Sequence, residues 1–384
     1  MSLTPLELAL GLPVGAGAPV ALPAGGDPLA ALEAAVLDPL RRGPCLVSFS
    51  GGRDSSAVLA VATRVARREG LPDPIPATIR AADAPLAEES RWQELVVSHL
   101  GLSDWVRLEF SGELDLVGPV AAAALRRHGL LWPFNAHFHV PLLEAARGGT
   151  VLTGIGGDEL FKSAATTRPP RRARSVALYA APRFARRRWY GRASVELHPW
   201  LTADGERAGR AALAAWDAAE PRRLRARMRH VRAARYLRVG TASLDLLAAD
   251  AGAAIAQPLL EPAVWAAVAG SAPHGGHRDR EAAMAAVFGA LLPPELIARP
   301  DKACFDEVFF HDHSRDFAAG WTGAGVPHDV IDARALGEHW RGGEPRAQSF
   351  SLLQAAWLAD GGQEPARRVV ERLPAARPPQ PQHG

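Results

Sequence analysis

The sequence predicts an α/β fold in which a doubly wound parallel sheet is followed by a mostly helical C-terminal half. Short apolar runs alternate with helical patterns over residues 43–160, an alternation typical of parallel strands joined by helices. A glycine turn joins the first apolar run directly to a helical pattern. Residues 161–384 carry no strand pattern and look helical.

Each element follows from its own pattern. Residues 1–42, rich in proline, glycine and alanine, indicate a poorly structured lead-in that turns helical near residues 28–40. Runs typical of buried strands occur at 45–50, 75–81, 105–110 and 150–154. Helical patterns lie between them at 57–68, 86–100, 114–128 and 136–147. The 86–100 helix shows an apolar face made of Trp92, Leu95, Val96 and Leu100.

The turn after the first strand has the composition of an anion-binding loop. It reads Ser50-Gly51-Gly52-Arg53-Asp54-Ser55-Ser56 and leads straight into a helix. Glycines let the backbone approach an anion closely, and the helix N-terminus favours phosphate. The three serine hydroxyls can add donors, and Asp54 can hold a magnesium ion. The turn is not a Walker A loop, because no Gly-Lys-Ser/Thr follows.

A second carboxylate is expected at the same edge of the sheet. Asp54 follows the first strand, and Asp158 follows the strand at 150–154. In doubly wound sheets, ligands bind beyond the carboxyl ends of the strands. We therefore expect Asp54 and Asp158 to converge on one crevice as the ligands of a magnesium–triphosphate complex.

Three segments carry a resemblance to a known family. Ser50-Gly51-Gly52-x-Asp54-Ser55 resembles the PP-loop of the ATP pyrophosphatases, which split ATP into AMP and pyrophosphate. Residues 151–161, Val-Leu-Thr-Gly-Ile-Gly-Gly-Asp-Glu-Leu-Phe, resemble the Ser-Gly-x-Gly-x-Asp-Glu-Leu-Phe segment of the asparagine synthetase synthetase domain. Residues 292–302, ending in Arg299-Pro300-Asp301-Lys302, resemble that family's late Leu-Pro-x-x-(I/L)-x-x-Arg-x-Lys region. The three occur in the family's order, and the resemblance covers roughly residues 43–360.

The resemblance implies ATP-dependent amide synthesis through an acyl-adenylate, with ATP and Mg²⁺ as cofactors. It implies that Asp54 and Asp158 bind the metal and that Lys302 is catalytic, neutralising charge as pyrophosphate leaves. Lys302 is one of only two lysines, with Lys162, among 44 basic residues. The residues that the resemblance assigns to nucleotide binding are Ser50, Gly51, Gly52, Asp54, Ser55, Ser56, Gly154, Gly156 and Gly157.

The chain departs from the family at the acceptor side. Ile155 stands where the asparagine synthetase motif has Glu and the β-lactam synthetases have Tyr. In the later segment Gly-Val-Glu-x-Arg-x-Pro-Phe-Leu-Asp, Ala254 replaces the Glu, Ala256 the Arg and Glu261 the Asp. The aspartate pocket and the acid–base dyad are both missing, so free aspartate is not the expected substrate. We also expect no glutaminase domain, because Ser2 stands where that domain would begin with cysteine.

A retained phosphate site beside a rewritten acceptor site resembles, in part, the lasso-peptide macrolactam synthetases. The expected substrates are a carboxylate and an amine, with a peptide as one option. A partner protein or leader peptide is a further expected partner, whereas nucleic acid is not. Five histidines (His128, His137, His139, His274 and His277) are candidates for a base, but none is assigned. Glu89, Trp92 and Glu94 fall where the family contacts nucleotide, although Trp92 is better explained by core packing.

Composition and charge narrow the classes of partner and the cellular compartment expected for the protein. Residues 168–238 hold 19 arginines and five acidic residues, a local balance of +14 inside a chain of net charge +3. This basic stretch fits an acidic partner or an anionic substrate, and also a solvated helical surface.

Cys45 and Cys304 form neither a metal cluster nor a disulfide framework. No stretch is apolar enough for a membrane span, and no basic residue precedes Arg41, so we expect a cytoplasmic protein without a signal peptide.

The sequence divides into four expected parts. Residues 1–42 form the lead-in and its helix, and residues 43–165 form the PP-loop nucleotide-binding core. Residues 166–373 form the helical, arginine-rich, acceptor-side region. Residues 374–384, with Arg-Pro-Pro-Gln-Pro-Gln, form a disordered tail.

Two rival functions remain open at this point. A PP-loop enzyme that modifies tRNA would use the arginine-rich stretch to bind RNA phosphates, but the second and third segments and the lack of a Cys-x-x-Cys pair argue against it. A non-catalytic nucleotide-binding homologue would explain the altered acceptor residues. The retention of Asp54, Asp158 and Lys302 argues against that alternative.

Overall fold

A five-stranded, all-parallel sheet in the order β3-β2-β1-β4-β5 forms the centre of the fold. The strands are β1 (Cys45–Ser48), β2 (Ile75–Ala81), β3 (Val106–Phe110), β4 (Thr150–Leu152) and β5 (Ala254–Ala256). The computed structural model describes residues 3–17, 20–81, 84, 89–165, 197–221, 223–274, 276–299 and 306–362. The predicted α/β fold with a parallel sheet and a helical remainder is confirmed.

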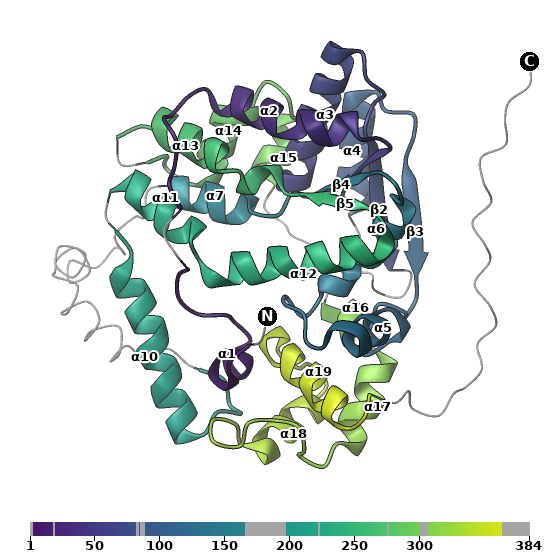
Figure 1. Cartoon of the computed structure of the whole chain (residues 1–384), viewed down its shortest axis with the longest axis vertical. Helices are drawn as coiled ribbons and strands as arrows, with labels where there is room; N and C mark the ends of the chain where they lie inside the picture. The colour runs from purple at the N-terminus through teal and green to yellow at the C-terminus, as the bar shows by residue number, and fades with distance from the viewer. Residues whose placement is uncertain are drawn as a thin grey trace, which may run out of the picture.

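Helices surround the sheet and continue to the C-terminal side (Figure 1). Those up to residue 164 are α1 (Pro5–Leu10), α2 (Pro28–Arg41), α3 (Arg53–Glu69), α4 (Ser90–Leu100), α5 (Pro119–His128), the 3₁₀ helix η2 (Ala136–His139), α6 (Val140–Ala145) and α7 (Gly157–Ala164). The later ones are α10 (Ala203–Ala219), α11 (Leu224–Arg232), α12 (Arg235–Ala251), η3 (Pro258–Leu260), α13 (Pro262–Ser271), α14 (Arg280–Phe288), α15 (Pro294–Ala298), α16 (Asp306–Phe309), α17 (Asp312–Gly320), α18 (Ala333–Arg341), η4 (Ala347–Ser349) and α19 (Phe350–Ala359).

The two faces of the sheet are covered by different helices. Leu46 and Val47 are neighbours on β1, so their side chains point to opposite faces. Val47 packs in a core with residues of α2, α3 and α13, whereas Leu46 packs in a core with residues of α6 and α12. Because both faces are buried, β1 reads as a continuous apolar run rather than an alternating one. This is the doubly wound arrangement.

Strand pairing places the two glycine turns side by side. β1 pairs in parallel with β4 through Leu46 opposite Val151 and Val47 opposite Leu152. The turn before α3 follows β1, and the turn before α7 follows β4. Both turns therefore leave the same edge of the sheet from adjacent strands, as expected for a ligand site at the carboxyl ends.

A separate core lies in the C-terminal helices. Residues of α1, α5 and α16–α19 form it, with Trp340, Phe350 and Trp357 among its largest buried side chains. In Figure 1 these helices gather at the bottom, while α2 and α3 lie at the top and α12 runs between the two groups. The lead-in contributes to this core through α1, a helix that the sequence pattern did not predict.

The expectation of no strand after residue 161 is wrong. β5 comes from the late segment that holds Ala254 and Ala256, and it pairs in parallel with β4 through Ile255 opposite Val151. Three residues with the sequence Ala-Ile-Ala give neither a period nor a strong strand preference. The altered acceptor segment therefore lies on the strand next to the second glycine turn.

Several predicted helix boundaries also change. The helix predicted at 57–68 begins at Arg53, so Asp54, Ser55 and Ser56 lie in its first turn. The helix predicted at 114–128 begins at Pro119, and the one predicted at 136–147 is η2 followed by α6. α4 begins at Ser90, and the first residues predicted for it, like the predicted tail, lie outside the described residues. Of the helices that the structure describes, none is both long and apolar enough to cross a membrane.

Candidate functional site

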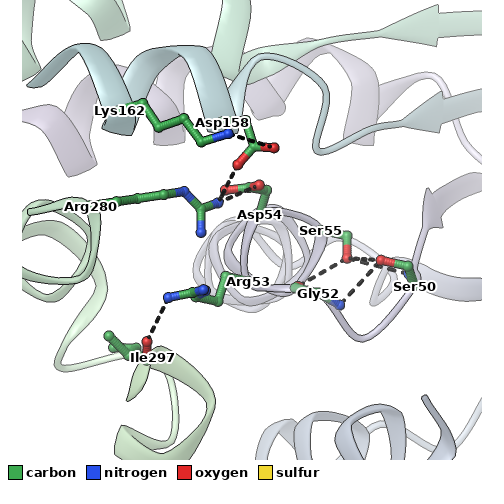
Figure 2. A network of polar contacts seen from close by, with 9 residues as sticks. All are labelled: Ser50, Gly52, Arg53, Asp54, Ser55, Asp158, Lys162, Arg280 and Ile297. Atoms are coloured by element: carbon green, nitrogen blue, oxygen red, sulfur yellow. Dashed lines mark hydrogen bonds and ion pairs between the residues drawn. The ribbon is translucent and has the colours of Figure 1, made fainter. Parts of the chain in front are cut away.

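Serine hydroxyls hold the first glycine turn in shape (Figure 2). The Ser50 and Ser55 hydroxyls lie 3.2 Å apart, and the Ser50 hydroxyl accepts the Gly52 backbone N–H at 3.2 Å. The Ser55 hydroxyl donates to the Gly52 carbonyl at 3.1 Å. Gly51 has φ +83°, a left-handed conformation that favours glycine. Within the described residues, no side chain caps α3, which leaves its N-terminus suited to an anion.

The second glycine turn packs directly against the first. A Cβ at Gly154 would lie 2.6 Å from the Ser55 backbone nitrogen, and one at Gly157 would lie 2.3 Å from Asp54 Cγ. Gly156 has φ +93°, and a Cβ there would meet the Leu260 side chain at 2.3 Å. Glycine at 154 and 157 therefore allows the two turns to approach closely enough for their acidic side chains to meet.

Asp54 and Asp158 meet at a single cation, Arg280 (Figure 2). Arg280 Nη2 donates to both carboxylate oxygens of Asp54, at 2.8 and 2.7 Å, and lies 3.2 Å from Asp158 Oδ1. Lys162 Nζ lies 3.5 Å from the other oxygen of Asp158. Burial raises the pKa of Asp54 to about 6, and the Asp158 carboxylate adds to this rise while Arg280 opposes it. The two predicted carboxylates are thus close together, and Arg280 partly neutralises them.

Arg280 was missed by sequence reasoning. It is the first residue of α14, next to the capping residue Asp279, and lies 226 positions from Asp54 in the chain. All but two of the 44 basic residues are arginine, so no local pattern distinguished this one. Only its place at the start of a helix that packs beside α7 brings it to the site.

The residues fit a magnesium ion that protein and phosphate hold together. Both carboxylates contact the same nitrogen of Arg280, so the guanidinium is a stand-in cation at the point where they converge. Magnesium is usually held by one or two carboxylates together with phosphate oxygens and waters. Among the residues that the structure describes, no group of three His, Cys, Asp or Glu could hold a metal. Asp54 and Asp158 would therefore need a bound phosphate to complete the coordination.

The third segment holds the first glycine turn from the other side. The buried Arg299 donates to the Gly51 carbonyl at 3.0 Å and to the buried Glu89 carboxylate, and its guanidinium lies 4.9 Å from the Trp92 ring centroid. Arg53 Nη1 donates to the Ile297 carbonyl at 3.1 Å. Trp92 packs against the main core, as predicted. Lys302 lies outside the described residues.

Replacing Arg299 by methionine should destabilise the fold. The change leaves the Glu89 carboxylate buried without its cation and removes a hydrogen bond to the glycine turn. Breaking one partner of a buried ion pair typically costs about 3 kcal/mol or more. Urea unfolding should show this loss, whereas Arg334→Met, which breaks an exposed pair with Glu338, should leave the unfolding midpoint unchanged. Equal midpoints for Arg299→Met and wild type would contradict the structural role.

The two glycine turns and the charged side chains around them line a cavity of about 290 Å³. It is lined by Ser48, Ser50, Gly52, Arg53, Asp54, Ser55, Glu89, His139, Thr153, Gly154, Ile155, Asp158, Arg280 and Arg299. Of the predicted nucleotide-binding residues, Gly51, Ser56, Gly156 and Gly157 are not in this lining. Ser56 is fully buried, and the three glycines shape the turns instead.

Two of the candidate histidines differ in their surroundings. His137 Nε2 lies 2.9 Å from the Leu114 carbonyl oxygen, and its buried ring packs inside the fold. His139 lines the cavity together with Ile155, and burial lowers the pKa of its imidazole to about 4. His139 and Ile155 therefore each contribute an uncharged surface to the cavity, in contrast to Asp54, Asp158 and Arg280.

Comparison with protein families agrees with the geometry. The family model for asparagine synthase matches residues 29–359, which include both glycine turns, Arg280 and the third segment. A search of the curated proteins found no match. The chain belongs to the asparagine synthase family, and it is therefore an ATP-dependent, amide-forming ligase in the general sense of that family.

Proposed function

We propose that the chain adenylates a carboxylate with ATP, releasing pyrophosphate, and transfers the acyl group from AMP to an amine. The convergence of Asp54 and Asp158 on one cation, beside a glycine turn at a helix N-terminus, carries the proposal. The turn and the start of α3 would hold the triphosphate. Asp54 and Asp158 would hold Mg²⁺, which, when bound, offsets negative charge on the phosphates.

The proposed reaction has two steps, and charged groups of the chain would serve the first. In the first step a carboxylate oxygen bonds to the α-phosphorus as the bond to pyrophosphate breaks. In the second, the amine nitrogen bonds to the acyl carbon, the bond to AMP breaks, and the nitrogen gives up its proton to solvent. Arg280, beside both carboxylates, and Lys302 would stabilise the negative charge that leaves with pyrophosphate.

The substrate proposed is larger and less charged than aspartate. Ile155 and the neutral His139 both line the cavity, and Ala254 and Ala256 lie on the strand that pairs with β4. These residues offer apolar contact rather than ionic partners to an amino acid with two carboxylates. We propose a peptide or another natural-product carboxylate, with macrolactam formation as one form of the reaction. A partner protein or leader peptide would bring such a substrate, and the cytoplasm is the proposed compartment.

The test is isotope exchange between pyrophosphate and ATP. Candidate carboxylates, including short peptides with acidic side chains, are each supplied with ATP, Mg²⁺ and labelled pyrophosphate. Label entering ATP only in the presence of one carboxylate would support adenylation and identify the acyl donor. Release of ADP and phosphate in place of AMP and pyrophosphate would contradict it. The absence of any nucleotide turnover would favour the non-catalytic alternative.

Aspartate and ammonia should give no asparagine. A carboxylate buried without polar partners typically costs several kcal/mol, which a small substrate cannot offset with other contacts. Incubation with ATP, Mg²⁺, aspartate and ammonia or glutamine, followed by mass spectrometry, checks this expectation. Efficient formation of asparagine would overturn the proposal that the acceptor side is specialised.

A further inference from the structure

Arg53 carries a positive charge at a place that disfavours one. It is the first residue of α3, directly after the first glycine turn, where the helix dipole favours negative groups. Burial and the nearby charge of Arg280 lower the pKa of Arg53. The charge of Arg299 lowers it further, whereas Asp54 and Glu281 raise it. The guanidinium still keeps its proton at neutral pH, so a cation stands where the electrostatics of the fold alone work against it.

The guanidinium of Arg53 has little to neutralise it. Within the described part of the chain, its one hydrogen bond runs from Nη1 to the Ile297 carbonyl at 3.1 Å, and no carboxylate lies within ion-pair distance. By contrast, Arg280 pairs with Asp54, and Arg299 pairs with Glu89. A guanidinium is a fork of N–H donors, and most of those on Arg53 are therefore available to a ligand.

These donors belong to the nucleotide cavity. Arg53, Arg280 and Arg299 all line it, and Figure 2 shows the side chains of Arg53 and Arg280 ending on the same side of α3. The buried Nε of Arg280 also has no hydrogen-bond partner among the described residues. A buried donor without an acceptor is unfavourable. Two arginines of one cavity thus have donors that the described protein groups leave unsatisfied.

A chain of phosphates fits these arginines better than a single carboxylate. A substrate carboxylate brings one negative charge, whereas the two terminal phosphates of ATP bring several, with oxygens that suit the guanidinium fork. Arg53 also lies at the N-terminus of α3, which has no side-chain cap among the described residues and so adds backbone N–H groups for the same anion. Bound phosphates would turn the unfavourable charge at residue 53 into a favourable one.

We propose that the side chain of Arg53 binds the two terminal phosphates of ATP, beside Arg280. That these phosphates leave together as pyrophosphate rests on the proposed function. The residue lies at the unspecified position x of the pattern Ser50-Gly51-Gly52-x-Asp54-Ser55, so the pattern itself gives it no role. Arg53 is thus a phosphate contact particular to this chain's version of the turn.

Calorimetric titration with inorganic pyrophosphate, and separately with AMP, tests the assignment. Both titrations contain Mg²⁺ and no carboxylate substrate. The wild type should bind pyrophosphate saturably. Arg53→Gln, which can still donate to the Ile297 carbonyl, should weaken this binding about tenfold or more, as expected for loss of a charge-assisted hydrogen bond. Arg53→Lys should recover part of the affinity. The affinity for AMP, which lacks the two terminal phosphates, should be the same in Arg53→Gln as in wild type.

Arg64→Met is the matched control, because Arg64 lies on the same helix, is largely exposed and pairs with Glu33. It should bind pyrophosphate like wild type. An unchanged affinity for pyrophosphate in Arg53→Gln would overturn the proposal, as would the absence of saturable binding by the wild type. Equal losses of pyrophosphate and AMP affinity would also overturn it, because they would mean that Arg53 only shapes the turn.

Two further points keep the test decisive. If Arg53→Gln does not fold, judged by circular dichroism, a wild-type affinity for pyrophosphate in a folded Arg53→Met would overturn the proposal equally. The titrations involve no turnover, so a failure of adenylation leaves their result unchanged. Conversely, an unchanged pyrophosphate affinity in the Arg53 variants would leave the proposed adenylation untouched.

Discussion

Replacing Asp54 or Asp158 by asparagine is expected to abolish pyrophosphate formation while leaving the fold intact. Asparagine keeps the size of each side chain and can still accept a hydrogen bond from Arg280, so packing changes little. It loses the negative charge that a magnesium ion requires. A metal ion that offsets charge on a transferring phosphoryl group contributes several kcal/mol, so we expect a loss of roughly a thousandfold or more.

The measurement is pyrophosphate–ATP exchange with the carboxylate substrate that the exchange assay identifies, together with calorimetric binding of Mg-ATP. Asp204→Asn is the matched control, because Asp204 is exposed and pairs with Arg207 one turn further along α10. Normal exchange in either Asp54→Asn or Asp158→Asn would refute the metal assignment. A melting temperature close to that of wild type would show that lost exchange is not lost folding.

The sequence predicted the site residues best where a short strand–turn–helix pattern also determines where the ligand lies in the fold. The two glycine turns follow buried strands, and the rule that ligands lie at the carboxyl ends was enough to bring Asp54 and Asp158 together. Gly154 and Gly157 are explained in the same way, since any side chain there would strike the neighbouring turn. These positions were predictable because each strand–turn–helix unit is short and local.

Contacts between distant segments were not predictable in this way. Arg280 reaches Asp54 across 226 residues, and Arg299 reaches Gly51 across 248. β5 is three residues long, and its strand conformation is imposed by pairing with β4 rather than by propensity. A hydrogen bond between Glu159 on α7 and Tyr236 on α12 also joins two helices that no local pattern relates. Each of these contacts depends on how the helices pack around the sheet, which neither amino-acid composition nor hydrophobic periodicity encodes.

One such distant contact, between Arg299 and Gly51, lies in the third segment, residues 292–302, which also contains the proposed catalytic Lys302. Arg299 donates to the Gly51 carbonyl and to Glu89, so its side chain holds the end of α15 against the first glycine turn. Lys302 itself is outside the described residues, but it follows Arg299 by three positions, and three residues span at most about 11 Å. The proposed function assigns this lysine to the triphosphate bound at the turn.

Lys302→Arg should therefore be far less active than wild type although the charge is kept. A lysine ammonium is a compact charge with three donors, whereas the guanidinium is a wide planar fork that cannot take the same place at a leaving phosphate. Loss of one such electrostatic contact typically costs about 3 kcal/mol, roughly a hundredfold in rate. The rate of pyrophosphate–ATP exchange should fall by this factor, while the affinity for Mg-ATP should move less, because the contact matters most as pyrophosphate leaves. Arg334→Lys, an exposed exchange of the same two residue types on α18, should leave both unchanged. Normal exchange in Lys302→Arg would mean that this lysine is an ordinary surface charge and that Arg280 is sufficient at the phosphates.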